Sequence, residues 1–454
     1  MHKNKSSILK VENFYSVHLD NTRDLFVYLP PSYRWDQAKR YPVLYMHDGQ
    51  NIFHPAFNGY SWNVHETADR LIQSGLMEEI IVVGIPNRGV ERADEFTHEL
   101  EGVLYSSDKV RIQPKGQLYE RFIIEEIKPY IDALFRTKPG PEHTGLMGSS
   151  RGGQVTYHIG FRRPDIFGKL AILSPYFYYV DPVTLEEYRQ YHTFGKKQPV
   201  SRIWIDLGGR EGTLIMEKHV REVAEQLALL GYEADDELMY FFDPEAAHVE
   251  KDWAARLTSP LLHLFGDKGQ ARSLSLQGWD EVGIRGPLCR LNPIAELDSG
   301  LKLSLLRAAY RVEDPRIVEV QEDGTVVAKE EGETTVTVNY CGLEAALSIR
   351  VVKELKERVA LDLTVHVPPH TPETVALYAW FPLSKQPDAP VYSGRLELPL
   401  HAEFVYQISR ADGVAETDQA GNPVVRHYRA EDDSRLELTV ERWSNDIRED
   451  ESSW

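Results

Sequence analysis

Five residues at positions 148–152, Gly-Ser-Ser-Arg-Gly, carry the pattern Gly-x-Ser-x-Gly with Ser150 at its centre. This pattern is typical of a nucleophile elbow, a sharp strand-to-helix turn that exposes one strained hydroxyl. The glycines allow a close approach of backbones at which a Cβ atom would clash. The neighbouring Ser149 lacks glycine two residues away on both sides. Ser150 is therefore the candidate nucleophile, and the chemistry it would perform is acyl transfer.

A serine nucleophile needs a base to take its proton and a carboxylate to orient that base. In α/β-hydrolases these groups follow the serine in the order acid, then histidine. Here the loop after one predicted strand carries Glu211, and the loop after the next strand ends in His248. Both loops lie at the carboxyl ends of strands, where open α/β sheets place their sites. Asp206, on the strand itself, and Asp243 are the alternatives to Glu211 as the acid.

The negative charge that develops on the substrate needs backbone N–H donors. We expect one from Arg151, the residue after the nucleophile, and the other from Gln50, in the loop after the second central strand. Removal of one such donor costs about 3–4 kcal/mol of transition-state stabilisation. Trp62 and Tyr176 are candidate substrate-binding residues, although aromatic side chains at these positions are also compatible with a core.

The elements that must position these residues alternate between strand-like and helix-like from residue 11 to residue 265. β-Branched and aromatic runs predict strands at 24–30, 42–46, 79–85, 169–174, 202–207 and 238–242. Apolar residues at helical spacing predict helices at 62–72, 119–134, 216–230 and 250–265. Such alternation implies an α/β fold, a mostly parallel sheet with helices on both faces.

The same segment resembles the esterase family of α/β-hydrolases that includes enterochelin esterases, feruloyl esterases, S-formylglutathione hydrolases and mycolyltransferases. The matching pieces are Tyr-Pro-Val-Leu-Tyr-Met-His-Asp-Gly-Gln-Asn at 41–51, Arg-Ala-Asp-Glu-Phe at 92–96, the elbow and the two loops that follow it. The resemblance implies an α/β-hydrolase fold. It also implies that Ser150 is the nucleophile, His248 the general base and acid, and Glu211 the carboxylate that fixes the imidazole tautomer.

After residue 265 the chain changes in character, and short strands replace long helices. Residues 266–273 are polar and contain glycine, which is typical of a linker. We expect an esterase domain at 1–267 and two all-β sandwiches at 274–353 and 356–446.

The first sandwich resembles a bacterial Ig-like module and the second resembles a starch-binding module. The second lacks tryptophan at 382–392 and 409–413, where such modules stack sugars. We interpret it as a structural or substrate-covering unit.

Composition limits the possible partners. The chain has 454 residues and a net charge of −19, which argues against nucleic acid and anionic membranes as partners. Apolar runs are too short to span a membrane, and the first residues do not read as a secretory signal. With only Cys289 and Cys341, the default is a cytoplasmic protein with reduced thiols. His47, His54 and Asp48 have no recognised metal-ligand spacing, so we expect neither metal nor cofactor.

These observations together predict a serine carboxylic-ester hydrolase that acts on a small-molecule or carbohydrate-linked ester. Two alternatives remain open: an acyltransferase, and a carbohydrate-binding or scaffold protein that keeps the hydrolase fold as a relic. The identity of the ester, the oligomeric state and any pairing of the two cysteines are not determined by the sequence.

Overall fold

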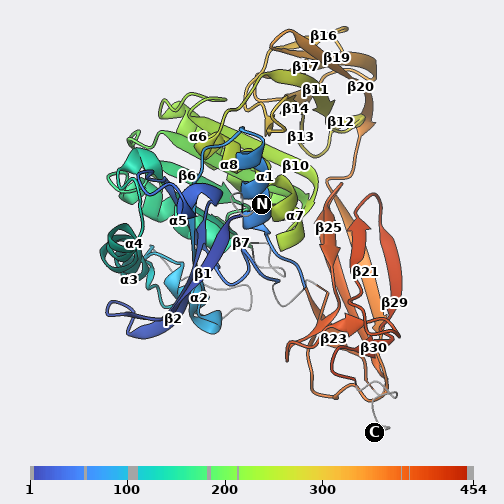
Figure 1. Ribbon diagram of the computed structural model, residues 1–454. Coiled ribbons are helices and arrows are strands. Elements are labelled where there is room, and N and C mark those ends of the chain that lie inside the picture. The colour runs from blue at the N-terminus through green and yellow to red at the C-terminus, as the bar shows by residue number, and fades with distance from the viewer. Residues whose placement is uncertain are drawn as a thin grey trace.

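The computed structural model (Figure 1) describes residues 5–55, 59–100, 111–180, 186–211, 214–379, 381–387 and 389–446. Its largest element is an 11-stranded mixed sheet in the order β1-β2-β4-β3-β5-β6-β9-β10-β15-β14-β11. The strands are β1 (Ser7–Ser16), β2 (Asn21–Leu29), β3 (Val43–His47), β4 (Ile81–Ile85), β5 (Thr144–Ser149), β6 (Lys169–Leu173), β9 (Arg202–Arg210), β10 (Leu238–Ala247), β11 (Ala271–Gln277), β14 (Asn292–Leu297) and β15 (Lys302–Ser304).

The central strands of this sheet, β4-β3-β5-β6-β9-β10, are parallel. Successive side chains of a strand point to opposite faces. In β3, Val43 and Tyr45 accordingly enter one buried core, whereas Leu44 and Met46 enter another on the opposite face. Two apolar faces explain why the central strands read as continuous hydrophobic runs. The predicted α/β-hydrolase fold is confirmed.

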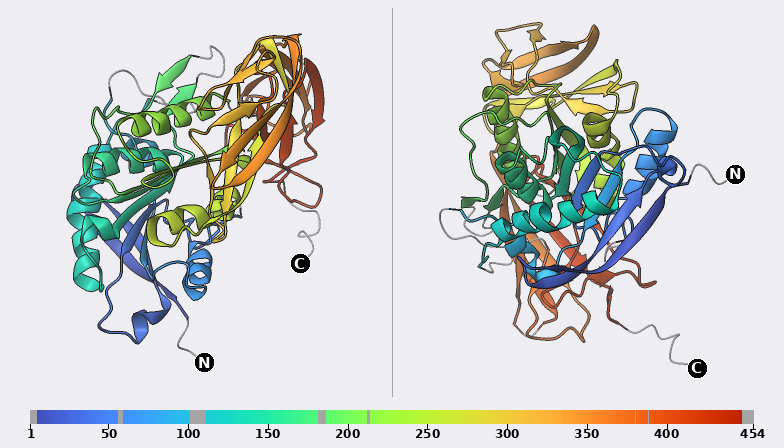
Figure 2. Two further views of the ribbon diagram at one scale, coloured as in Figure 1. Left: turned by 90° about the horizontal axis from the view of Figure 1, so that it is seen from above. Right: turned by 60° about the vertical axis from the view of Figure 1, so that its left-hand side comes forward.

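Helices cover both faces of the sheet (Figure 2). One core contains residues of α3, α4, α5, α6 and the segment between α3 and α4. The other core contains residues of α1, α7 and α8. The helices are α1 (Val64–Gln73), α2 (Arg92–Glu95), α3 (Gly116–Arg121), a π-helical segment (Phe122–Ile127), α4 (Lys128–Leu134), α5 (Arg151–Arg162), α6 (Leu214–Leu229), α7 (Glu250–Arg256) and α8 (Thr258–Phe265). The helix expected at 250–265 is thus two helices that meet at Leu257.

The sheet continues beyond the predicted linker. Strands β11, β14 and β15 come from the expected second unit, yet they extend the hydrolase sheet past β10 in an antiparallel manner. Leu297, Leu301 and Leu303 are buried in the same core as α1 and α8. The first strands after residue 270 therefore belong structurally to the sheet that carries the predicted site.

The rest of the chain is β-rich. A four-stranded sheet, β12-β20-β19-β16, and a three-stranded sheet, β13-β18-β17, share one apolar core. The C-terminal part, residues 358–443, has a six-stranded sheet, β26-β22-β23-β24-β21-β29, and a core of its own. The remaining strands are β7 (Tyr178–Val180), β8 (Glu187–Arg189), β12 (Glu281–Arg285), β13 (Cys289–Arg290), β16 (Tyr310–Val312), β17 (Val318–Val320), β18 (Thr325–Ala328), β19 (Gly332–Tyr340), β20 (Leu343–Glu354), β21 (Arg358–His366), β22 (Leu377–Tyr378), β23 (Pro382–Lys385), β24 (Val391–Pro399), β25 (Glu403–Tyr406), β26 (Ser409–Arg410), β27 (Glu416–Thr417), β28 (Arg426–Arg429), β29 (Ser434–Thr439) and β30 (Arg442–Trp443).

Two smaller findings bear on the sequence-based expectations. Cys289 is buried, Cys341 is exposed, and both are free thiols. Burial raises the pKa of the Cys289 thiol to about 11. In the part of the chain that the structure describes, none of the helices has the length and apolar character needed to cross a membrane.

Candidate active site

Ser150 lies at the turn between β5 and α5, as predicted for a nucleophile elbow. Its backbone has φ 57° and ψ −123°, a conformation that a residue with a side chain adopts only under strain of about 1–3 kcal/mol. Ser149 is buried, with 4% of the residue exposed, whereas Ser150 is partly exposed. Of the two adjacent serines, Ser150 is the one whose hydroxyl can meet a ligand.

The glycines of the elbow are explained by the packing around it. A Cβ atom on Gly148 would lie 2.7 Å from the carbonyl carbon of Gly152, inside any real contact distance. A Cβ atom on Gly152 would lie 3.2 Å from Oδ2 of Asp48, which belongs to the loop after β3. The spacing of the pattern therefore allows the strand, the helix and the neighbouring loop to approach closely.

Glu211 and His248 meet at the ends of two neighbouring strands. Glu211 directly follows β9 and His248 directly follows β10. Their atoms Oε2 and Nδ1 are 2.9 Å apart. The side chain of Glu211 is 2% exposed, and that of His248 is 34% exposed. The carboxylate is thus sequestered while the imidazole reaches the surface.

The surroundings of Glu211 hold it in the ionised form. Its Oε1 accepts hydrogen bonds from the Ser174 hydroxyl at 2.6 Å, the Gly208 N–H at 2.7 Å and the Arg256 guanidinium at 3.1 Å. Burial acts to raise the pKa of this carboxyl group, but the hydrogen bond to His248 and the charge of Arg256 outweigh it, and the pKa is lowered. Since Glu211 is then an acceptor only, His248 must donate through Nδ1.

The alternative acids do not reach His248 in this arrangement. Asp206 is fully buried within β9, where it accepts a 2.7 Å hydrogen bond from Nε1 of Trp204 and pairs with Arg256 at 3.1 Å. Burial raises the pKa of Asp206 to about 6. Asp243, which the structure places on β10 and not in a loop, accepts a hydrogen bond from the backbone N–H of Glu245 on the same strand. Among the three carboxylates considered from the sequence, the structure brings Glu211 to the histidine.

Ser174 is a site residue that the sequence reasoning missed. Its hydroxyl bonds to Glu211 and also accepts from Nε1 of Trp253 at 3.0 Å and from Arg256 at 2.6 Å. The Trp253 ring lies edge-on to the His248 ring, with centroids 5.0 Å apart. One signal was present in the sequence: Ser174 ends a predicted strand at the same edge as the loops of Glu211 and His248.

Ser150 is joined to this network through the backbone. Its N–H donates to the carbonyl of Leu173 at 3.0 Å, and its carbonyl accepts from the N–H of Tyr176 at 3.0 Å. These two residues flank the segment that contains Ser174. Within the described residues, no hydrogen bond links the Ser150 hydroxyl directly to His248. Such contacts are often long in free enzymes and tighten when substrate binds.

The loop after β3 is built as a rigid support. Asp48 has φ 55°, and its carboxylate accepts two hydrogen bonds from Arg92, at 2.7 and 2.8 Å, and one from Asn87 at 2.6 Å. These partners lower the pKa of the buried Asp48 in spite of its desolvation. A Cβ atom on Gly49 would lie 2.3 Å from the carbonyl carbon of Gly84. The loop is thereby held against β4 and the start of α5.

The predicted oxyanion-hole residues lie on either side of the contact between the loop after β3 and the start of α5. Arg151 is the first residue of α5, where backbone N–H groups have no acceptor within the helix. Gln50 follows Gly49, and its Oε1 accepts from the backbone N–H of Asn87 at 3.1 Å. The guanidinium of Arg151 packs 4.2 Å from the centre of the Tyr176 ring. The structure therefore places Tyr176 beside the elbow.

Trp62 is placed differently. It is 3% exposed and packs on Trp253, with ring centroids 5.5 Å apart. Trp62 therefore packs behind Trp253, the residue whose ring contacts His248.

Of the histidines considered for metal binding, His47 contacts the hydroxyl of Tyr119 at 3.0 Å and His54 contacts the ring of Phe26. The described residues contain no group of three or more His, Cys, Asp or Glu side chains that could hold a metal ion.

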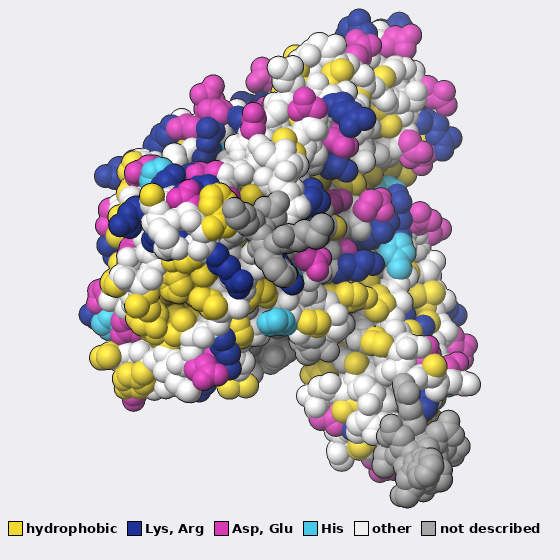
Figure 3. Space-filling view, viewed as in Figure 1, with side chains coloured by type: hydrophobic (Ala, Val, Ile, Leu, Met, Phe, Trp, Pro, Cys, Tyr) yellow, Lys and Arg dark blue, Asp and Glu magenta, His cyan; other side chains and the backbone are white. Residues whose placement is uncertain are grey.

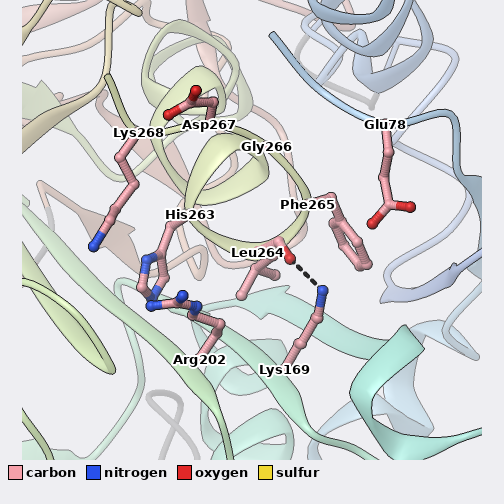
Figure 4. Close-up of a pocket in the computed structure, with 9 residues that line it drawn as sticks. All are labelled: Glu78, Lys169, Arg202, His263, Leu264, Phe265, Gly266, Asp267 and Lys268. Atoms are coloured by element: carbon pink, nitrogen blue, oxygen red, sulfur yellow. Dashed lines mark hydrogen bonds between the residues drawn. The ribbon is translucent and has the colours of Figure 1, made fainter. Parts of the chain in front are cut away.

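A cavity of about 430 Å³ lies elsewhere (Figure 4). Its lining includes Lys169 and Arg202, the first residues of β6 and β9. It thus opens at the amino ends of the strands, whereas Ser150, Glu211 and His248 all follow carboxyl ends. Ligand sites of open α/β sheets lie at the carboxyl ends, so this cavity is separate from the candidate active site.

Comparisons with known proteins identify the family of this chain. The profile of the family described as "Putative esterase" matches residues 16–264, and the chain belongs to that family. It is 25% identical over 258 residues to the protein YbbA of Bacillus subtilis, a match that covers 55% of this chain and 96% of YbbA. It is 30% identical over 171 residues to an endo-1,4-beta-xylanase/feruloyl esterase of Xylanibacter ruminicola, covering 36% of this chain and 20% of that protein.

A solved ferulic acid esterase of Anaeromyces mucronatus is 20% identical, and the match covers 57% of this chain and 93% of that one with a TM-score of 0.42. On its family and fold, the protein is a carboxylic ester hydrolase.

Proposed function

We propose that the protein hydrolyses carboxylic esters through a covalent acyl intermediate on Ser150, with His248 as base and Glu211 as the orienting carboxylate. The observation that carries this proposal is the 2.9 Å hydrogen bond between Glu211 and His248, at the same sheet edge as a serine in the strained elbow conformation. A nucleophile, a base and a group that orients the base are what acyl transfer requires.

In the acylation step, Oγ of Ser150 attacks the ester carbonyl carbon and its proton passes to Nε2 of His248. The imidazolium is stabilised because its Nδ1–H donates to the Glu211 carboxylate. The carbonyl oxygen becomes an oxyanion, and the backbone N–H groups of Gln50 and Arg151 stabilise it. When the carbonyl re-forms, the bond to the leaving alcohol breaks and the alcohol takes the proton from Nε2.

In the deacylation step, water replaces the alcohol. His248 removes a proton from the water as it attacks the acyl carbon, and the same donors stabilise the second oxyanion. Collapse of this intermediate releases the carboxylic acid and returns the proton to Oγ of Ser150. His248, Glu211 and the two backbone N–H donors thus act in both steps, and no cofactor takes part in either.

The test is the pair of variants Ser150→Ala and Ser149→Ala, assayed with p-nitrophenyl acetate. We expect Ser150→Ala to lose activity by about 10⁶-fold, as removal of a serine nucleophile does elsewhere. Ser149→Ala is the matched control, because Ser149 is the adjacent serine and is buried, and it should retain turnover. Full activity in Ser150→Ala would overturn the proposal, because another residue would then be the nucleophile. The relic scaffold predicts a different result: retention of the wild type on a starch column and no labelling of Ser150 by a fluorophosphonate.

The acid portion of the substrate is proposed from the relatives. The Xylanibacter ruminicola protein, 30% identical over the matched segment, has a feruloyl esterase activity in its name. An aromatic acyl group would suit a site beside Tyr176. We therefore propose feruloyl esters as the first class to assay, alongside acetylated sugars, thioesters and siderophore esters. Addition of an alcohol acceptor to the same assay separates hydrolysis from acyl transfer.

A further inference from the structure

The C-terminal part of the chain contacts the strand that carries the proposed catalytic acid. Glu211 forms an isolated antiparallel bridge with Phe404, a residue of β25 that is buried in the core of the C-terminal part. In Figure 1, β25 stands at the side of that part nearest the hydrolase sheet. The backbone at Glu211 is therefore held by a segment that follows it by almost two hundred residues along the chain.

A charged side chain next to Glu211 strengthens this contact. Nε of Arg210 donates to Oε1 of Glu403 at 2.7 Å, and Arg210 also pairs with Glu245. Glu245 lies on β10, in the strand end that leads to His248. The same oxygen of Glu403 is 2.6 Å from Nε2 of His427 on β28. Arg210 thus joins the strand of the acid, the strand of the base and the C-terminal part.

Glu403 is ionised in this setting. Burial acts to raise its pKa, but the hydrogen bonds to His427 and Arg210 outweigh that effect, and the pKa is lowered. The contact with Arg210 is therefore a charge-assisted hydrogen bond, which is shorter and stronger than a neutral one.

The strand pairing within the hydrolase sheet is irregular near the ends of β9 and β10. β6 pairs with β9 only as far as Asp206. The pairing of β9 with β10 shifts in register at a bulge between Asp243 and Ala247, and it resumes for a single pair, Arg210 with Ala247, before Glu211 and His248. Bulges leave residues unpaired and bend the strand. The bridge from Phe404 of β25 to Glu211 adds a backbone contact directly beyond this single pair.

We infer that the C-terminal part is a component of the active site, in which Glu403, through Arg210, and Phe404, through its bridge, position Glu211 against His248. This inference rests on the proposed function of Glu211. It assigns Glu403 as a positioning residue, since it acts through Arg210 and touches no reacting atom. In the space-filling view, a notch in the outline lies between the lower ends of the hydrolase part and the C-terminal part (Figure 3).

The experiment uses the full-length chain with Glu403→Gln, which keeps the shape and removes the charge. Displacement of a catalytic group by 1 Å can cost about 100-fold in rate, and we expect kcat to fall by about tenfold with KM unchanged. The melting temperature should change little, because the two side chains are only partly buried, 18% of Glu403 and 31% of Arg210 being exposed, and glutamine keeps the shape of the side chain. A purely structural role would lower the melting temperature and leave kcat as it is.

Glu437→Gln is the matched control. Glu437 also pairs with a histidine, His366, at 2.6 Å, and it lies on β29 of the same C-terminal part, so its replacement should leave kcat unchanged. An equal kcat in wild type, Glu403→Gln and Glu437→Gln would overturn the inference. A raised KM at constant kcat would also overturn it, since that result assigns the C-terminal part to substrate contact.

A second pair of variants decides the matter if Glu403→Gln lowers the melting temperature. Arg210→Lys retains a charge that can reach Glu403, and Arg210→Met does not. We expect kcat of Arg210→Lys to exceed that of Arg210→Met; equal values would count against the inference. Failure of the proposed function is recognised separately, because Ser150→Ala would then remain active whatever the behaviour of the Glu403 and Arg210 variants.

Discussion

The hydroxyl of Ser174 donates a 2.6 Å hydrogen bond to Oε1 of Glu211, the carboxylate whose Oε2 holds His248. The same hydroxyl oxygen accepts from Trp253 and Arg256. Ser174 itself follows β6, the strand between those of the elbow and of Glu211. Ser174 therefore connects the hydrogen bonds that hold Glu211 to the segment that bonds to the backbone of Ser150. The site is one hydrogen-bonded unit.

Glu211→Gln should keep the shape of the acid and lose the charge that fixes the tautomer of His248. We expect kcat to fall on the order of 10³- to 10⁴-fold, as for loss of the orienting carboxylate in a serine triad. Steady-state kinetics with p-nitrophenyl acetate measures the change. Asp206→Asn is the control, because Asp206 does not contact His248, and its loss should be far smaller. A larger loss in Asp206→Asn than in Glu211→Gln would show that Asp206 is the acid.

Ser174→Ala should affect both catalysis and stability. It removes an acceptor from buried Trp253 and Arg256, and an unsatisfied buried polar group costs about 1–3 kcal/mol. We expect the free energy of unfolding in urea to drop by that amount and kcat to fall, because Glu211 loses a donor. A kcat equal to that of wild type would show that Glu211 is held adequately by Gly208 and Arg256 alone.

Gly148→Ala tests the packing of the elbow. The added Cβ atom would lie 2.7 Å from the carbonyl group of Gly152, and overpacking of this kind costs about 1–3 kcal/mol. We expect a lower melting temperature and a loss of activity, since the turn must shift. Gly195→Ala is the control, because nothing lies within 4 Å of the Cβ position there. Equal stability and activity in both variants would refute the packing argument.

The buried Asp206 gives a pH dependence of stability. Its pKa is raised from 3.8 to about 6 in the folded protein by burial. A group with a raised folded-state pKa stabilises the fold below its unfolded pKa, and this contribution is lost as the pH rises through the folded value. Two units correspond to about 3 kcal/mol. The free energy of unfolding in urea should therefore fall by about 3 kcal/mol more in wild type than in Asp206→Asn when the pH is raised from 4 to 7. A constant difference across this range contradicts the raised pKa.

Much of the fold and the proximity of Glu211 and His248 could be predicted from the sequence. Buried parallel strands read as short apolar runs, and the carboxyl ends of such strands share one edge, so polar residues in those loops must lie near one another. The order of serine, acid and histidine then separated His248 from the other histidines of the chain.

The supporting contacts could not be predicted in the same way. Ser174 meets Glu211, Trp253 and Arg256 across 37, 79 and 82 residues of sequence, and no local pattern reports such pairs. The extension of the sheet by β11, β14 and β15 depends on which strand edge is free after folding. The contact of Glu403 with Arg210 likewise depends on how two separately packed parts meet.

The most direct test of the account is to locate the acyl group on the enzyme. Wild type, Ser149→Ala and Ser150→Ala are treated with a fluorophosphonate and with a slowly hydrolysed p-nitrophenyl ester, digested, and analysed by peptide mass spectrometry. The account predicts a single adduct on Ser150 in wild type and in Ser149→Ala, and none in Ser150→Ala. An adduct on any other residue, or ester turnover by Ser150→Ala at the wild-type rate, would contradict it.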